Sequence, residues 1–144
     1  MSPLQKRALY GVIFGAIWAI AIVVVFILMG GAAAFDTDQT FRLIMDGIWI
    51  GGLIVYLVLF YPIIRKPTQV DERDKLILDR SPRSQWLAII FTLVAWVIGL
   101  TEGYRNQGIP TVFMYLMFIS VLIVSSVAQC VGILLGYRSM NRND

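Results

Sequence analysis

Long apolar runs separated by short polar stretches are the main feature of this chain. Four runs contain no charged residue, and each can supply the ~20 apolar residues that cross a ~30 Å hydrocarbon core, the third with help from its flanks. Polar and apolar positions do not alternate with a period of two, and backbone groups inside a bilayer must be hydrogen-bonded within the segment. The pattern therefore predicts four transmembrane helices, at about residues 8–30, 43–64, 84–102 and 110–137.

The polar stretches between these runs are short. The predicted outer loops read GGAAAFDTDQTF and EGYRNQGIP, and we expect no folded unit in either. The expected fold is all-α, an integral membrane four-helix bundle in which residues 1–144 form a single membrane domain. A short cytoplasmic interfacial helix is expected in the loop at 65–83, between the second and third spans.

Composition and charge support a membrane protein and orient it. Hydrophobic residues make up 58% of the chain and charged residues 15%, which is too apolar for an ordinary soluble domain. Of the 12 Lys and Arg residues, only Arg42 and Arg105 fall on the predicted outer side. The others are Lys6, Arg7, Arg65, Lys66, Arg73, Lys75, Arg80, Arg83, Arg138 and Arg142. The positive-inside rule therefore predicts a cell (inner) membrane protein with cytoplasmic N- and C-termini, and nucleic-acid binding is not expected.

The first apolar run has a second interpretation. Lys6 and Arg7 before it, and Ala32 to Ala34 after it, match the flanks of a signal peptide with a small-residue cleavage site. Its apolar core is about twice the usual ~7–15 residues, which favours an uncleaved span. Cleavage would remove one helix and leave the orientation of the other three unchanged.

Several kinds of chemistry lack the residues that they need. The chain contains no His, which excludes bis-His haem, His general-base catalysis and the commonest zinc and copper sites. Cys130 is the single cysteine, so an intramolecular disulfide and a Cys-x-x-Cys redox pair are excluded. We therefore expect no catalytic residue, no metal site and no cofactor, and interpret Cys130 as a small apolar filler.

Acidic residues near the membrane bear on transport. A transporter or channel normally has ionisable groups or a broken helix near the bilayer midplane. Asp46 and Glu102 instead fall near the outer ends of the second and third spans, with Arg42 and Arg105 close in sequence. Interfacial ion pairs or solvated helix ends are the simplest interpretation. If the two spans pack together, the two acids would frame a shallow outer cation site.

Polar and small residues predict how the spans pack. Ser125 and Gln129 share a face of the fourth span that should meet the other helices. A ligand pocket there would need polar residues from other spans, and Thr92 is the one candidate at similar depth. Small residues at four-residue spacing let helix backbones approach closely in lipid. We expect these stripes to serve packing within the chain first and a homo-oligomer interface second. They are Gly11 and Gly15, Gly47 and Gly51, and Gly132 and Gly136.

The loop at 65–83 is the most charged stretch of the chain. Thr68 followed by Asp71 is typical of a helix start with a capping box. We expect a short amphipathic helix over about residues 69–80. It should stop before Pro82, because the residue preceding a proline avoids helical geometry, and Ser81 should then cap the third span.

The same loop has a recognisable motif: Asp71, Glu72, Arg73 and Asp74, followed by Ile77 and Arg80. It resembles the signature of a family of small, uncharacterised four-span membrane proteins of bacteria and archaea, whose cytoplasmic loop reads Asp-Glu-Arg-(Asp or Glu) before a helix that runs into the next span. The resemblance covers the four-span plan and this tetrapeptide. Some similar proteins are thought to partner small DNA-binding regulators or transport systems, which implies a docking surface. The alternative is that these residues only cap a helix and neutralise nearby charges.

These observations favour a non-enzymatic multi-pass membrane protein whose cytoplasmic loop binds a protein partner. A small oligomeric transporter or channel, lined by Asp46, Glu102 and the face of Ser125 and Gln129, is the alternative. Apart from the lipid bilayer, the expected partners are a cytoplasmic or membrane protein and further copies of the chain.

Overall fold

Four long helices and one short helix form the part of the chain that the structure describes. The computed structural model describes residues 2–65, 72–106 and 108–140, with the backbone alone for residues 60–65. The helices are α1 (Pro3–Leu28), α2 (Gly31–Thr37), α3 (Gln39–Arg65), α4 (Glu72–Gly103) and α5 (Thr111–Met140). All elements in the described part of the chain are helices, which confirms the all-α class. The four long helices have the length and apolar composition to cross a membrane. The expected cap at Thr68 and Asp71 lies outside the described residues.

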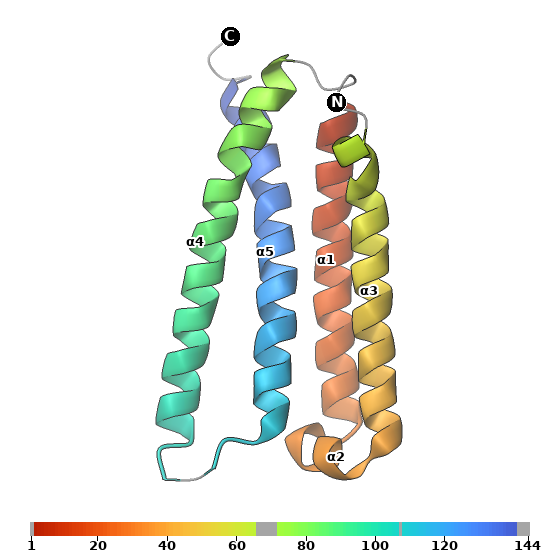
Figure 1. Ribbon diagram of the computed structural model, residues 1–144, viewed down its shortest axis with the longest axis vertical. Coiled ribbons are helices and arrows are strands. Elements are labelled where there is room, and N and C mark those ends of the chain that lie inside the picture. The colour runs from red at the N-terminus through yellow and green to blue at the C-terminus, as the bar shows by residue number, and fades with distance from the viewer. Residues whose placement is uncertain (1, 66–71, 107, 141–144) are drawn as a thin grey trace.

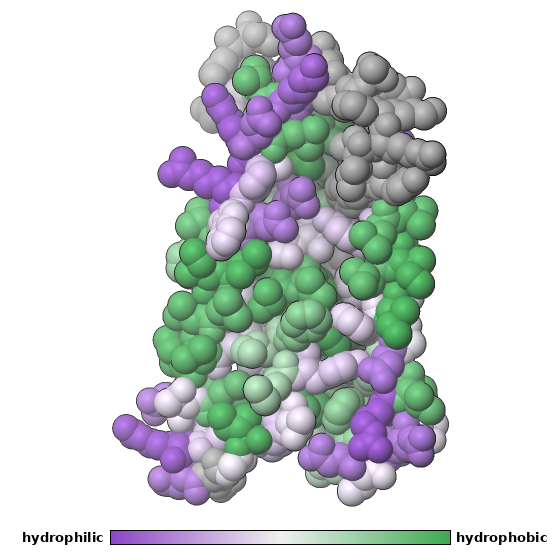
Figure 2. Space-filling model, in the orientation of Figure 1, coloured by the Kyte–Doolittle hydropathy of each residue, from purple (hydrophilic) through white to green (hydrophobic). Residues whose placement is uncertain are grey.

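The long helices lie side by side in the order α4, α5, α1, α3 (Figure 1). α5 packs against both α4 and α1, and α1 packs against α3, so that α3 and α4 form the two edges. We call the end of the molecule where α1 and α4 begin and α5 ends the terminal end, and the opposite end the α2 end. An apolar band covers the middle of the surface, with polar residues at both ends (Figure 2).

A two-glycine turn joins α1 to α2. Gly30 and Gly31 have φ of 97° and 68°, a left-handed conformation that glycine adopts without strain. The turn directs the buried Phe35 of α2 onto Phe41 at the start of α3, with the ring centroids 5.4 Å apart in a T-shaped arrangement. The stretch expected to be a short outer loop therefore contains a two-turn helix, which one aromatic side chain anchors.

Buried side chains form two separate clusters. The cluster toward the α2 end joins α1, α2, α3 and α5 through Trp18, Ile22, Phe35, Phe41, Met45, Val112, Ile119 and Ile123. The cluster at the terminal end joins α1, α4 and α5 through Leu4, Ala8, Ile77, Cys130, Ile133 and Tyr137. The buried residues of α4 are Asp74, Ile77 and Ser81, all within its first ten residues. The core therefore holds α4 at its start and leaves the rest of that helix on the periphery.

The helix expected to stop before Pro82 instead runs through it, and Ser81 is not an N-cap. Proline has no backbone N–H, so the carbonyl of Leu78, four residues earlier, loses its usual helical donor. The Ser81 hydroxyl donates to that carbonyl at 3.0 Å. A side chain thus replaces the missing backbone bond, and the predicted interfacial helix and third span form one continuous helix.

Candidate functional site

The start of α4 has one buried and one exposed face. Asp74, Ile77 and Ser81 are buried, at spacings of three and four residues that follow one side of a helix. Charged side chains occupy the other side, where Glu72, Lys75, Asp79 and Arg80 are exposed. Glu72 and Asp74 in the first turn also suit the positive end of the helix dipole. The helix end is therefore attached along one side and presents charge along the other.

A chain of hydrogen bonds fixes the buried face. Tyr137 of α5 donates from its hydroxyl to Asp74 Oδ1, and the same Tyr137 oxygen accepts from Ser2 Oγ at 2.7 Å. Ser2 also caps α1, because its Oγ accepts from the backbone N–H of Gln5 at 3.2 Å. Asp74 is 6% exposed and Tyr137 is 5% exposed, so these bonds compensate two buried polar groups. Three helix ends are thereby joined at the terminal end.

Close approach of α4 to α5 depends on two glycines. A Cβ built on Gly136 would lie 3.0 Å from Ile77 Cγ2, and one on Gly132 would overlap Ser84 Oγ. The single hydroxyl proton of Ser84 can be donated to the carbonyl of Ser81, at 2.7 Å, or to that of Ala128 on α5, at 3.2 Å. The predicted stripe of Gly132 and Gly136 is thus the surface of α5 on which α4 rests.

The tetrapeptide at 71–74 does not form one surface. Asp71 lies outside the described residues, Glu72 is exposed and Arg73 is half-buried. Asp74 is buried under Tyr137, where its carboxylate is not accessible to a partner. Of the predicted docking residues with described side chains, Glu72 is therefore the most accessible.

The two acidic residues predicted near the membrane surface lie on opposite edge helices. Asp46 of α3 accepts a hydrogen bond of 2.5 Å from the Tyr115 hydroxyl of α5, and Arg42 donates to the carbonyl of Asp36 at 3.2 Å. Glu102 is exposed near the end of α4. Because α5 and α1 lie between α3 and α4, the packing that a shared cation site required is not formed within one chain.

Polar groups also line the contact between α3 and α5. The Tyr56 hydroxyl donates to Gln129 Oε1 at 3.1 Å, and Trp49 stacks near Phe118 with ring centroids 6.0 Å apart. Trp49 Nε1 is the buried side-chain polar atom that has no hydrogen-bond partner in the described part of the chain. Thr92, the candidate from another span for a polar pocket at this depth, donates to the Ala88 carbonyl of its own helix at 2.7 Å.

The remaining glycine stripes behave differently from one another. Gly11 and Gly15 are buried, and a Cβ on Gly15 would overlap Val127 of α5. Gly47 and Gly51 are exposed, with no atom within 4 Å of a Cβ built on either. The close contact of α3 is made by Gly52, on which the Trp18 ring of α1 lies.

Within residues 2–65, 72–106 and 108–140, no group of three His, Cys, Asp or Glu side chains is placed to hold a metal ion. Cys130 is completely buried in the terminal-end cluster.

Comparisons with protein families, with curated proteins and with solved structures gave no match to this chain. The resemblance of residues 71–74 to a family of small membrane proteins stays a prediction.

Proposed function

We propose that this chain is a multi-pass membrane protein without enzymatic activity, and that the start of α4 is its docking site for a protein partner in the cytoplasm. The proposal rests on the two faces of this helix end: a fixed face, which is buried against the other helices, and a displayed face, which is exposed. Asp74 and Ile77 are buried against the other helices, whereas Glu72, Lys75 and Asp79 are exposed. A helix end that is already ordered offers both signs of charge to a partner at little entropic cost.

Photocrosslinking in native membranes tests this proposal. A photoreactive residue in place of Lys75 should capture one reproducible protein, and the same residue in place of the exposed Arg105, at the α2 end, should not. Glu72→Ala should reduce the capture, because that substitution changes the displayed face. Capture of lipid or of the chain alone would reject the docking site.

We further propose that the terminal end faces the cytoplasm of a cell with an inner membrane. Among the residues whose side chains are described, the exposed basic residues at this end are Lys6, Lys75, Arg80, Arg83 and Arg138, against Arg42 and Arg105 at the α2 end. In a Cys130→Ala background, a membrane-impermeant maleimide should label Asn106→Cys in intact cells. Arg138→Cys should be labelled only after permeabilisation, and the reverse pattern would reject the orientation.

A small oligomeric transporter is the second candidate. Polar side chains along the contact of α3 with α5 favour it, since Asp46 and Gln129 are both found there. Glu102 would join them only across copies of the chain, because it belongs to the opposite edge helix. Flux in proteoliposomes that is lost in both Asp46→Asn and Glu102→Gln would support transport over docking.

A further inference from the structure

An apolar pocket opens where α4 separates from α1. α4 has no buried residue after Ser81, so its later turns lie at the periphery of the core. In Figure 1 its ribbon leans away from α1 toward the α2 end, with α5 behind the gap. The pocket that results has a volume of about 300 Å³. This is the lower end of the ~300–1,000 Å³ range typical of ligand sites.

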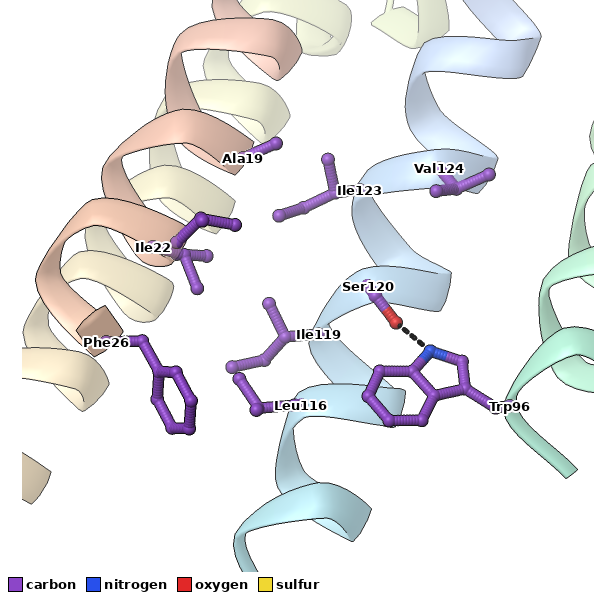
Figure 3. Close-up of a pocket in the computed structure, with 10 residues that line it drawn as sticks. Ala19, Ile22, Phe26, Trp96, Leu116, Ile119, Ser120, Ile123 and Val124 are labelled. Atoms are coloured by element: carbon purple, nitrogen blue, oxygen red, sulfur yellow. Dashed lines mark hydrogen bonds between the residues drawn. The ribbon is translucent and has the colours of Figure 1, made fainter. Parts of the chain in front are cut away.

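The walls of this pocket come from three helices (Figure 3). Ala19, Val23 and Phe26 of α1 form one side, Leu116 and Ser120 belong to the α5 floor, and Trp96 closes the α4 side. The Trp96 indole donates from Nε1 to Ser120 Oγ at 2.7 Å, while the Ser120 hydroxyl donates to the Met117 carbonyl at 2.9 Å. The polar groups in the wall are therefore already hydrogen-bonded to one another. A polar ligand would find no free partner here, whereas a hydrocarbon chain loses nothing on entry.

The position of the pocket indicates where such a chain would come from. Trp96 lies seven residues before the end of α4 at Gly103, or about 10 Å along the helix, and the exposed Arg105 follows two residues later. This depth is about a third of a ~30 Å hydrocarbon core. A phospholipid with its phosphate near Arg105 would thus extend an acyl chain to the level of Trp96. Phe113 lies between these levels, with its ring centroid 6.4 Å from that of Trp96 and 5.3 Å from that of Tyr104.

We propose that this pocket binds one acyl chain of a phospholipid from the leaflet at the α2 end, with Arg105 as the cation for its phosphate. The bound chain fills the wedge between α1 and α4, so it restores the van der Waals contacts that the walls otherwise lack. This site is separate from the docking face at the start of α4.

Photolabelling in proteoliposomes tests the proposal. The probe is phosphatidylglycerol with a diazirine in one acyl chain, added as a minor component of phosphatidylcholine vesicles. We expect adducts on Ala19, Leu116 and Val124, which line the pocket, and a severalfold decrease in Val23→Trp, whose indole would fill the entrance. Val24→Trp is the matched control, since Val24 is adjacent and exposed but does not line the pocket.

Two further variants separate the outcomes. Ala19→Phe fills the pocket from a second position, with Ala16→Phe on the exposed side of α1 as its control. Arg105→Gln should lower labelling by the phospholipid probe but not by a diazirine-bearing isoprenoid alcohol.

Adducts confined to exposed residues such as Ile17 and Phe91 would overturn the pocket while leaving membrane insertion intact, and equal labelling of all variants would also overturn it. An unchanged signal in Arg105→Gln would overturn the assignment to a phospholipid.

Discussion

Tyr137 is the residue that links the fold at the terminal end. Its hydroxyl is hydrogen-bonded to Asp74 and Ser2, and Asp74 is buried. We expect Tyr137→Phe to lower the free energy of unfolding by about 1–3 kcal/mol, because it leaves a buried carboxylate oxygen without its donor. Thermal unfolding in detergent measures the change.

Tyr10→Phe is the matched control for that experiment. Tyr10 is 57% exposed, so loss of its hydroxyl should leave the stability of the protein nearly unchanged. If the two variants unfold at the same temperature, the bonds of Tyr137 contribute nothing to stability, and the anchoring of α4 must come from Ile77 and the glycine contacts alone.

Neighbouring glycines of α3 should respond oppositely to the same substitution. Gly52→Ala would put a methyl group into the Trp18 ring, which overpacks the contact between α1 and α3 and should cost about 1–3 kcal/mol. Gly51→Ala meets no atom within 4 Å and should be neutral or stabilising by up to about 1 kcal/mol, since alanine favours helix. Thermal unfolding of monomeric protein compares the two. A destabilising Gly51→Ala would instead indicate an interface on that face.

The sequence predicted the types of residue that make contacts between helices better than it predicted their positions. The spacing of Gly47 and Gly51 predicted that these two glycines make the close contact of α3. The contact is made by Gly52 instead, because the Trp18 ring of α1 lies on it. The position of that ring cannot be derived from the spacing of glycines. Gln129 was expected to have a polar partner across helices, and it has one, but the partner is Tyr56. The sequence did not identify Tyr56, Tyr115 and Tyr137 as hydrogen-bond donors, because the pattern of residues does not say which polar group lies opposite each tyrosine.

At the scale of elements, the Ser81 hydroxyl should stabilise α4 because Pro82 has no backbone N–H to donate. Ser81→Ala leaves the Leu78 carbonyl without a donor and should cost about 1–2 kcal/mol. In a Pro82→Ala background the backbone N–H of residue 82 can donate to that carbonyl, so the same change should cost clearly less. A double-mutant cycle on thermal or denaturant unfolding measures this coupling. Additive effects of the two substitutions would refute the compensation.

The existence of the four long helices could be predicted because hydrocarbon thickness and backbone satisfaction act on each segment separately. The boundaries of the helices could not be predicted where tertiary contacts decide them. Proline rules predicted a break before Pro82, and the Ser81 hydroxyl together with the packing of Ile77 on Gly136 overrides that rule. α2 was missed for the same reason, since its seven residues depend on Phe35 meeting Phe41.

At the scale of the whole molecule, hydropathy carries no information about which helices are neighbours. The order α4, α5, α1, α3 follows from particular contacts, such as the bond from Trp18 Nε1 to the Ile48 carbonyl at 3.1 Å. A closed bundle would bring the second and third spans together, and the shared acidic site depended on that closure. With α3 and α4 at opposite edges, any site that needs both helices requires a second copy.

Engineered disulfides can test this order directly. Cβ positions at residues 77 and 136 are 3.5 Å apart, and those at residues 15 and 127 are 3.8 Å apart, both within the ~3.5–4.5 Å that a disulfide requires. In a Cys130→Ala background, Ile77→Cys with Gly136→Cys should oxidise readily within one chain, and so should Gly15→Cys with Val127→Cys. The two bonds lie on different sides of α5, so their joint formation places α5 between α1 and α4. Gly51→Cys with Ala95→Cys, on the exposed faces of α3 and α4, is the pair that separates the two arrangements: it should give no intrachain bond here, whereas a closed bundle would form it together with the other two.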